Sequence, residues 1–222
     1  MIDPGRIRRA IGPLRLVFWG GIICVLDFKI NSFDVLNDFI GSLLIAVGVG
    51  MLCSIPVHSR YRRVMVFVLV MAIYGCITDF LANFSPEYPQ PIPWIMGLLS
   101  LMGIAAIIAF CMAMRWFCLE AALERSARSW RTTTVLAVII YAIPLGGFYL
   151  IGLGAALAGE SFRFNPGKEA LILLVVLVPV FLAPLIHILI STSRMKREAA
   201  AAGPVTTMGG AGDMPPPPSP GD

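Results

Sequence analysis

Residues 64–81 read VMVFVLVMAIYGCITDFL, and the basic stretch RYRR precedes them at residues 60–63. A helix needs about 20 consecutive apolar residues to cross the hydrocarbon core of a bilayer, which is about 30 Å thick. The run holds a single charged residue, Asp79, and this residue lies near its end. These residues therefore predict a transmembrane helix.

The composition of the whole chain agrees with this prediction. The 222 residues are 58% hydrophobic and 14% charged, and their mean hydropathy is +0.83. Soluble domains carry about 25% charged residues, so the composition excludes an ordinary water-soluble fold. About six or seven crossings would use the whole chain, which leaves no room for a separate soluble domain.

Five apolar runs are long enough to cross a membrane, at residues 39–55, 64–81, 94–114, 133–157 and 170–190. A sixth run, residues 14–26, is shorter, and the arginines before it make it similar to the apolar core of a secretory signal. No small-x-small cleavage pattern follows it, and extension through Phe33 restores about 20 residues. We therefore predict an all-α polytopic membrane helix bundle with six transmembrane helices, of which the first, residues 14–33, is retained.

The positions of the basic residues orient this bundle. When the loops alternate between the two sides, all but three of the seventeen Lys and Arg fall on one side, and the exceptions are Lys29, Arg163 and Lys168. Cytoplasmic loops carry the excess of Lys and Arg in membrane proteins. We therefore expect both termini in the cytoplasm, and an even number of crossings is consistent with this because it puts both ends on one side.

The cytoplasmic stretch 115–131 has the pattern of an amphipathic helix. Its apolar residues recur at spacings of three and four, at Trp116, Leu119, Leu123, Ala127 and Trp130. Such a helix would lie at the inner membrane surface, with its arginines toward anionic lipid. A second interpretation is that this helix docks a partner membrane protein, and the sequence does not separate the two.

The last residues, 199–222, are rich in Ala, Gly and Pro and end in the run MPPPPSPGD. They have almost nothing apolar to bury, so burial cannot offset the entropy of ordering them. We expect a disordered cytoplasmic tail.

The sequence carries no motif of a known catalytic centre. It has no HExxH, GxSxG, Walker or dinucleotide-binding pattern, and its five cysteines form no CxxC pair. We therefore expect no enzyme activity, no cofactor and no resident metal. The expected partners are the lipid bilayer and another membrane protein, and no nucleic acid.

Three aspartates on three predicted helices form the one group of residues that suggests chemistry. Asp27, Asp38 and Asp79 lie about 20 to 26 Å above the inner ends of their helices, which puts them in one layer near the outer boundary. Acidic groups in transmembrane segments are costly and often functional, and oxygen ligands suit Ca²⁺, Mg²⁺ or Na⁺. The layer is therefore a candidate cation or proton site, with Lys29 as a competing counter-charge. The alternative is structural, because carboxylates at a helix start cap free backbone amides.

His187 lies about 15 Å from this layer and cannot belong to the same site. Pro179 and Pro184 on its helix remove backbone donors and predict a kink. We expect its imidazole to bond to a freed carbonyl one turn back, and the alternative is a proton relay.

One part of the chain suggests relatives. The stretch LVFWG at residues 16–20, running into LDFKINSFDVLNDFIG at 26–41, resembles the opening of an uncharacterised family of small bacterial multi-pass membrane proteins. In that family the first two helices form a hairpin around an acidic connection. The resemblance implies a retained first helix and a bacterial plasma membrane, and it implies no activity.

Three classes of function fit these observations. The first is a non-catalytic membrane component or partner subunit, which would use residues 115–131 and the tail. The second is a small cation or proton-coupled transporter or channel, which would use Asp27, Asp38 and Asp79. The third, and the most remote, is a membrane-embedded enzyme.

Overall fold

The computed structural model describes residues 4–25, 29–30, 33–34, 38–82, 92–157 and 168–201. Nearly all of these residues are helical, which confirms the all-α prediction. The helices are α1 (Pro4–Val25), α2 (Asp38–Cys53), α3 (Ser59–Ala82), α4 (Ile92–Glu120), α5 (Glu124–Ala137), the π-helix η1 (Val138–Ala142), α6 (Ile143–Leu157) and α7 (Lys168–Ala201).

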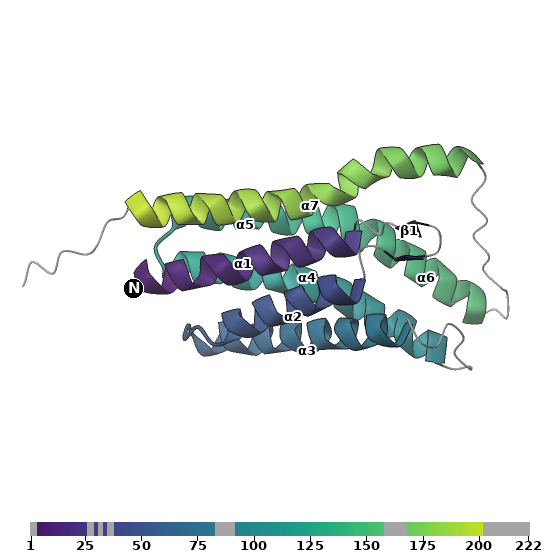
Figure 1. Ribbon diagram of the computed structural model, residues 1–222, viewed down its shortest axis with the longest axis horizontal. Coiled ribbons are helices and arrows are strands. Elements are labelled where there is room, and N and C mark those ends of the chain that lie inside the picture. The colour runs from purple at the N-terminus through teal and green to yellow at the C-terminus, as the bar shows by residue number, and fades with distance from the viewer. Residues whose placement is uncertain are drawn as a thin grey trace, which may run out of the picture.

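The helices pack as a ring in chain order (Figure 1). Each of α1 to α4 contacts the next, α4 contacts α5, and α7 returns to contact both α5 and α1. Helix α5 continues through η1 into α6 without a break, so these three segments form one long rod that bends, with α6 inclined to α5 in Figure 1. Pro4 and Ala201, the first and last described residues, therefore lie at the same end of the bundle.

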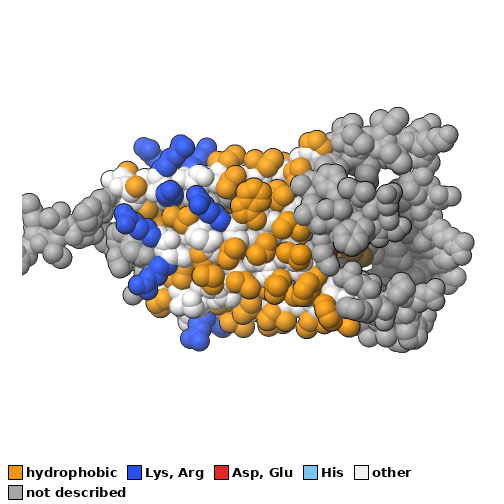
Figure 2. Space-filling view, viewed as in Figure 1, with side chains coloured by type: hydrophobic (Ala, Val, Ile, Leu, Met, Phe, Trp, Pro, Cys, Tyr) orange, Lys and Arg blue, Asp and Glu red, His pale blue; other side chains and the backbone are white. Residues whose placement is uncertain are grey.

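The surface of the bundle is divided by residue type. Lys and Arg side chains cluster at the end where α1 begins, and apolar side chains cover the middle (Figure 2). Within the described residues, three helical stretches are long and apolar enough to cross a membrane, namely Ser59–Leu81, Leu101–Glu120 and Glu124–Gly152. Helix α2 is apolar but shorter. These features fit a helical membrane protein, while the six predicted crossings stay a prediction.

The first helix differs from its prediction at both ends. It was expected over 14–33, but α1 begins at Pro4 and ends at Val25. Proline is tolerated in the first turn of a helix, because the amide it lacks has no helical partner there. Beyond α1, β1 (Lys29–Ile30) pairs with the antiparallel strand β2 (Phe33–Asp34), so the chain has left the helix well before Phe33.

The single amphipathic helix predicted over 115–131 is wrong. Helix α4 runs to Glu120, and α5 starts at Glu124 after a turn in which Ala122 has a φ of 59°. The amide of Leu123 donates to the Cys118 carbonyl at 2.8 Å, and the amide of Ala122 donates to the Leu119 carbonyl at 3.1 Å. These two bonds form a Schellman motif, which ends α4 and reverses the chain.

The residues of the predicted stripe consequently separate. Trp116 stays on α4, whereas Leu123, Ala127 and Trp130 are buried in the bundle. Trp130 packs edge-on against Phe110 with ring centroids 6.0 Å apart. The stripe is therefore mostly part of the core of the bundle.

The first three residues of the predicted tail are helical. Helix α7 continues to Ala201, so residues 199–201 are helical, whereas residues 202–222 lie outside the described residues.

The core is concentrated toward the basic end, and its largest fully buried side chains include Trp130, Tyr61, Phe117, Leu14, Leu52, Met65, Met114 and Met195.

Glycine lets α1 and α2 approach each other closely. A Cβ atom at Gly20 would lie 2.5 Å from the Gly41 carbonyl oxygen, and one at Gly48 would lie 2.7 Å from the Pro13 carbonyl oxygen. Real Cβ atoms do not come this close to backbone, so any side chain here would push the helices apart. Gly20 sets the distance between α1 and α2 near Asp38, and Gly48 sets it farther along the crossing, toward the basic end.

Candidate functional site

Two of the predicted aspartates lie at the same end of the bundle, opposite the basic end. Asp38 begins α2, and Asp79 lies in the last turns of α3. Ser42, one turn after Asp38, donates its hydroxyl to Oδ2 of Asp79. The Cys24 sulfur of α1 lies 3.8 Å from the Asp38 carbonyl oxygen and 3.8 Å from Ser42 Oγ. Helices α1, α2 and α3 therefore meet in one polar cluster, which we call the acidic cluster (Cys24, Asp38, Ser42 and Asp79).

The structure does not describe where the side chains of the other two predicted residues lie relative to this cluster. Asp27 lies outside the described residues. Lys29 belongs to β1, where Asp34 is its partner in the strand register. Among the described residues, no group of three or more His, Cys, Asp and Glu side chains is placed to hold a metal ion. The described part of the predicted site thus consists of two carboxyl groups and the hydroxyl between their helices.

A second polar group lies between α5 and α7. Thr133 Oγ1 is 2.8 Å from His187 Nδ1 and 3.1 Å from Ser191 Oγ, and Ser129 Oγ is 2.9 Å from Ser191 Oγ. Arg194 extends the chain of contacts by donating to Ser129 Oγ at 3.4 Å. Thr133, Ser129 and Ser191 are buried, so the group holds the two helices together inside the bundle.

This geometry differs from the sequence prediction for His187. Its Nδ1 atom contacts the Thr133 hydroxyl of another helix, where a carbonyl of its own helix was expected. Pro184 does lie inside α7, one turn before His187. The Thr133 hydroxyl is within reach of this ring because α5 packs directly against α7.

An apolar cavity of about 390 Å³ lies within the ring of helices. Cys24 of the acidic cluster and Thr133 of the second polar group both line it, and nearly all the other lining residues are apolar. An unpaired ion is expensive in such surroundings. The cavity therefore separates the two polar groups and does not connect them by a polar path.

The basic end carries a cleft of about 920 Å³ between α5 and α7, here called the arginine cleft. It is lined by Arg125, Arg128, Arg194, Arg197, Glu198 and Ala201. Helix α5 has no side-chain cap of its own, and Glu198 of α7 supplies one. Its carboxylate accepts the backbone amides of Arg125 at 3.1 Å and Ser126 at 2.8 Å, and the Ser126 hydroxyl at 2.6 Å.

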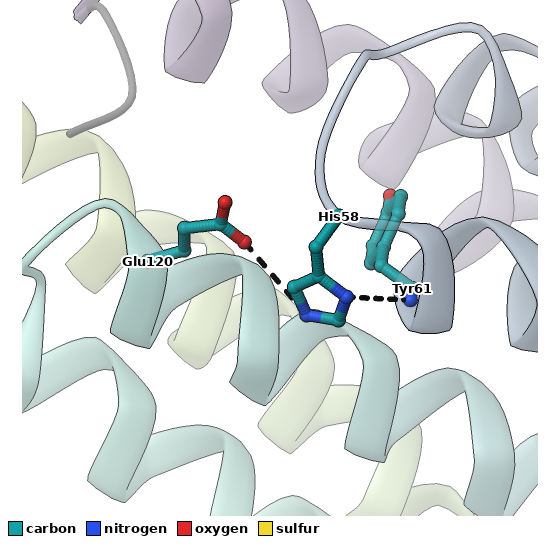
Figure 3. Close-up of polar contacts among 3 residues, drawn as sticks. All are labelled: His58, Tyr61 and Glu120. Carbon is teal, nitrogen blue, oxygen red and sulfur yellow. Dashed lines mark hydrogen bonds and ion pairs between the residues drawn. The ribbon is translucent and has the colours of Figure 1, made fainter.

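The loop from α2 to α3 is tied to α4 at the same end (Figure 3). His58 Nδ1 accepts the backbone amide of Tyr61 at 3.0 Å, which caps the start of α3. A ring nitrogen that accepts carries no proton, so His58 Nε2 bears the hydrogen that faces Glu120 at 3.7 Å. Arg60 lies over the Trp116 ring, 5.4 Å from its centroid. These contacts fasten α3 to α4 and leave the arginine cleft to α5 and α7.

No protein-family model, curated protein or solved structure matches this chain. The resemblance of residues 16–41 to a bacterial membrane family therefore stays a prediction.

Three residues that shape these sites were not predicted from the sequence. Ser42 follows Asp38 by four positions, a spacing that places both on one helix face, and this was the available signal. Glu198 and Thr133 gave no signal, because their partners lie 72 and 54 residues away along the chain.

Proposed function

We propose that this chain is a non-catalytic integral membrane protein, a scaffold or partner subunit, that crosses the bilayer six times with both termini in the cytoplasm. The basic end of the bundle would face the cytoplasm, following the positive-inside rule. The apolar belt between the two ends supports this placement. A bacterial plasma membrane is part of the proposal through the resemblance of residues 16–41.

One observation carries the non-catalytic part of the proposal. The polar side chains that would be candidates for chemistry make contacts between helices: Ser42 with Asp79, Thr133 with His187, and Glu198 with the start of α5. Each of these contacts joins two helices of the ring. Their common role would be to specify how an apolar bundle packs, because interhelical hydrogen bonds help to associate helices in lipid.

The proposed topology is tested with reporter fusions at both ends of the chain. Fusions after Met1 and after Asp222 should both report the cytoplasmic side. A third fusion in the segment between α3 and α4, residues 83–91, should report the opposite side. Termini in different compartments would overturn the six-crossing proposal.

A small cation or proton-coupled transporter is the second candidate. Ser42, one turn after Asp38, bonds to Asp79, and Cys24 of the same cluster lines the cavity, which favours this candidate. Against it stands the apolar lining, which offers no polar path toward the basic end. The remote enzyme alternative gains no support from the contacts described.

Replacing Asp79 by Asn separates the two candidates. The variant is measured for folded yield and for cation and proton uptake into vesicles, beside Asp38→Asn and Asp27→Asn. A lower yield of folded protein, with no flux in either the parent or the variant, would support the structural proposal. Normal yield with uptake that is present in the parent and lost in the variant would establish the transporter instead.

A further inference from the structure

The arginine cleft concentrates positive charge that the described residues do not neutralise. Arg125 and Arg128 come from the first turns of α5, and Arg194 and Arg197 come from the last turns of α7. All four side chains are exposed, and within the described residues none of them forms an ion pair. Glu198, the acidic residue of the cleft, is committed to the backbone amides of α5. The cleft is therefore suited to an anionic ligand.

The type of cation indicates the type of anion. A guanidinium group presents several donors in a planar fork, which matches the oxygens of a phosphate group. Two arginines on each of two facing helices can hold one headgroup from both sides. The hydrogen bonds that the backbone amides of Arg125 and Ser126 donate to Glu198 fix how far apart these helices lie at this point.

Apolar side chains continue the arginine face along both helices. On α5, Arg128 is followed on the same face by Val135 and Ile139, which are 48% and 56% exposed. On α7, Ile190 and Ile186 precede Arg194 on its face at four-residue intervals, and they are 41% and 47% exposed. The two helices run in opposite directions, so both apolar stretches point from the cleft toward the middle of the bundle.

The length of these stretches suits one leaflet. From Arg128 to Ile139 the helix rises about 16 Å, close to half of the roughly 30 Å of hydrocarbon in a bilayer. A free phosphate ion would use only the arginines, whereas a phospholipid would use the arginines and the apolar residues together. The apolar stretches therefore favour a lipid as the source of the phosphate.

We propose that the arginine cleft binds the phosphate headgroup of an anionic phospholipid of the cytoplasmic leaflet, with an acyl chain lying along the exposed faces of α5 and α7. This inference rests on the proposed function, since it needs the basic end to face the cytoplasm. The lipid would lie in the groove between α7 and the α5 rod, at the cytoplasmic surface of the membrane.

The test compares two variants that lose the same charge. In R128Q/R197Q, one arginine is removed from each side of the cleft, and Arg194 keeps its contact with Ser129. In the control R62Q/R63Q, two exposed arginines are removed from α3, which does not neighbour α5 or α7 in the ring. The full chain is purified in detergent, and binding of phosphatidylglycerol and phosphatidylcholine is measured by native mass spectrometry and by titration.

The parent protein should retain one phosphatidylglycerol in preference to phosphatidylcholine. R128Q/R197Q should weaken this binding by about 30-fold, as expected for two cations at a membrane surface. The control should weaken it by less than about threefold, because solvent and salt screen distant charges. A further variant, V135S/I190S, should also weaken phosphatidylglycerol binding while it leaves the arginines in place.

Several results would overturn the proposal. Equal losses in R128Q/R197Q and in the control would show only a general attraction of the basic end for anionic lipid. Displacement of the lipid by millimolar inorganic phosphate, with V135S/I190S unchanged, would show a site for free phosphate. Lipid binding in detergent does not depend on membrane orientation, so a failed topology from the reporter fusions would leave this measurement intact and the two failures can be told apart.

Discussion

Gly41 and Gly147 both lie within apolar helices, yet their surroundings are opposite. A Cβ atom at Gly41 would lie 2.6 Å from Cys24 Sγ and 2.8 Å from the Gly20 carbonyl oxygen. A Cβ atom at Gly147 of α6 would meet nothing within 4 Å among the described residues. The contact of α1 with α2 therefore depends on the absence of side chains, whereas α6 uses its glycines for no described contact.

The exposed residues of α6 extend the comparison. Ile143, Leu150 and Ile151 are each more than 60% exposed, and α6 leans away from the ring in Figure 1. The same rod is tightly held at its other end, where α5 packs against α4 and α7. The helices are thus closely packed near the acidic cluster and at the α5 end of the rod, and they are less closely packed along α6.

The largest expected effect comes from adding one methyl group at the α1–α2 crossing. Gly41→Ala should lower the free energy of unfolding by about 2 to 3 kcal/mol, because the helices must move apart to admit the Cβ atom. Unfolding by SDS titration in mixed micelles measures the change. The matched control is Gly50→Ala on the same helix, where the nearest atom to the new Cβ is Leu69 Cδ1 at 3.8 Å. Equal destabilisation by both substitutions would contradict the close crossing.

Removing the cap at the start of α5 should have the next largest effect. Glu198→Ala leaves two backbone amides and the Ser126 hydroxyl without their acceptor, and we expect a loss of about 2 kcal/mol. Glu198→Gln keeps an acceptor oxygen and should lose less. Hydrogen exchange at the Ser126 amide should accelerate in the alanine variant, and unchanged exchange there would refute the capping role.

The joint between the tight and the open part of the rod is expected to respond more weakly. Tyr141 of η1 donates its hydroxyl to the Phe181 carbonyl of α7, and the two rings stack with centroids 6.0 Å apart. Tyr141→Phe keeps the stacking and removes the hydrogen bond, which should cost about 1 kcal/mol. Tyr149→Phe serves as the control, since its hydroxyl makes no hydrogen bond within the described residues. If Tyr149→Phe lowers the free energy of unfolding as much as Tyr141→Phe does, the hydrogen bond from Tyr141 to Phe181 does not account for the effect.

The smallest effect should have the opposite sign. Gly147→Ala adds a methyl group where the described structure is open and where alanine is the better helix former, so it should stabilise the protein by about 0.5 kcal/mol. The same SDS titration used for Gly41→Ala measures it. Destabilisation by Gly147→Ala would mean that α6 is packed against something outside the described residues. It would contradict the conclusion that Gly41 is closely packed and Gly147 is not.

The sequence was sufficient for features that depend on local hydrophobicity. Long apolar runs predicted the helical stretches, including Ser59–Leu81. The length and hydropathy of a run are enough for this prediction, which needs no knowledge of the residues that the run contacts. Counting the rise per residue placed Asp38 and Asp79 at one depth, and the structure brings them to one end of the bundle. Both inferences use only distance along a helix.

Other features depend on the backbone or on distant partners, and the sequence did not show them. The turn at Ala122 has a positive φ at a residue that is neither glycine nor asparagine, so no familiar signal interrupts the periodic pattern from Trp116 to Trp130. Helical spacing continued through the turn and predicted one helix where there are two. The pairing of Ser42 with Asp79 depends on how α2 and α3 are rotated, which hydropathy does not determine.

The bridge from Glu198 to α5 also has a consequence for the order of events during biosynthesis. Its partners Arg125 and Ser126 are made 73 and 72 residues earlier. At about 5 to 20 residues per second, the ribosome needs roughly 4 to 15 s to bridge that interval. Throughout this delay the amino end of α5 has no acceptor from its own segment, so water or lipid headgroups must serve it. Arrival of α7 both closes the ring of described helices and ends that exposure, so a segment made late holds the earlier ones in place.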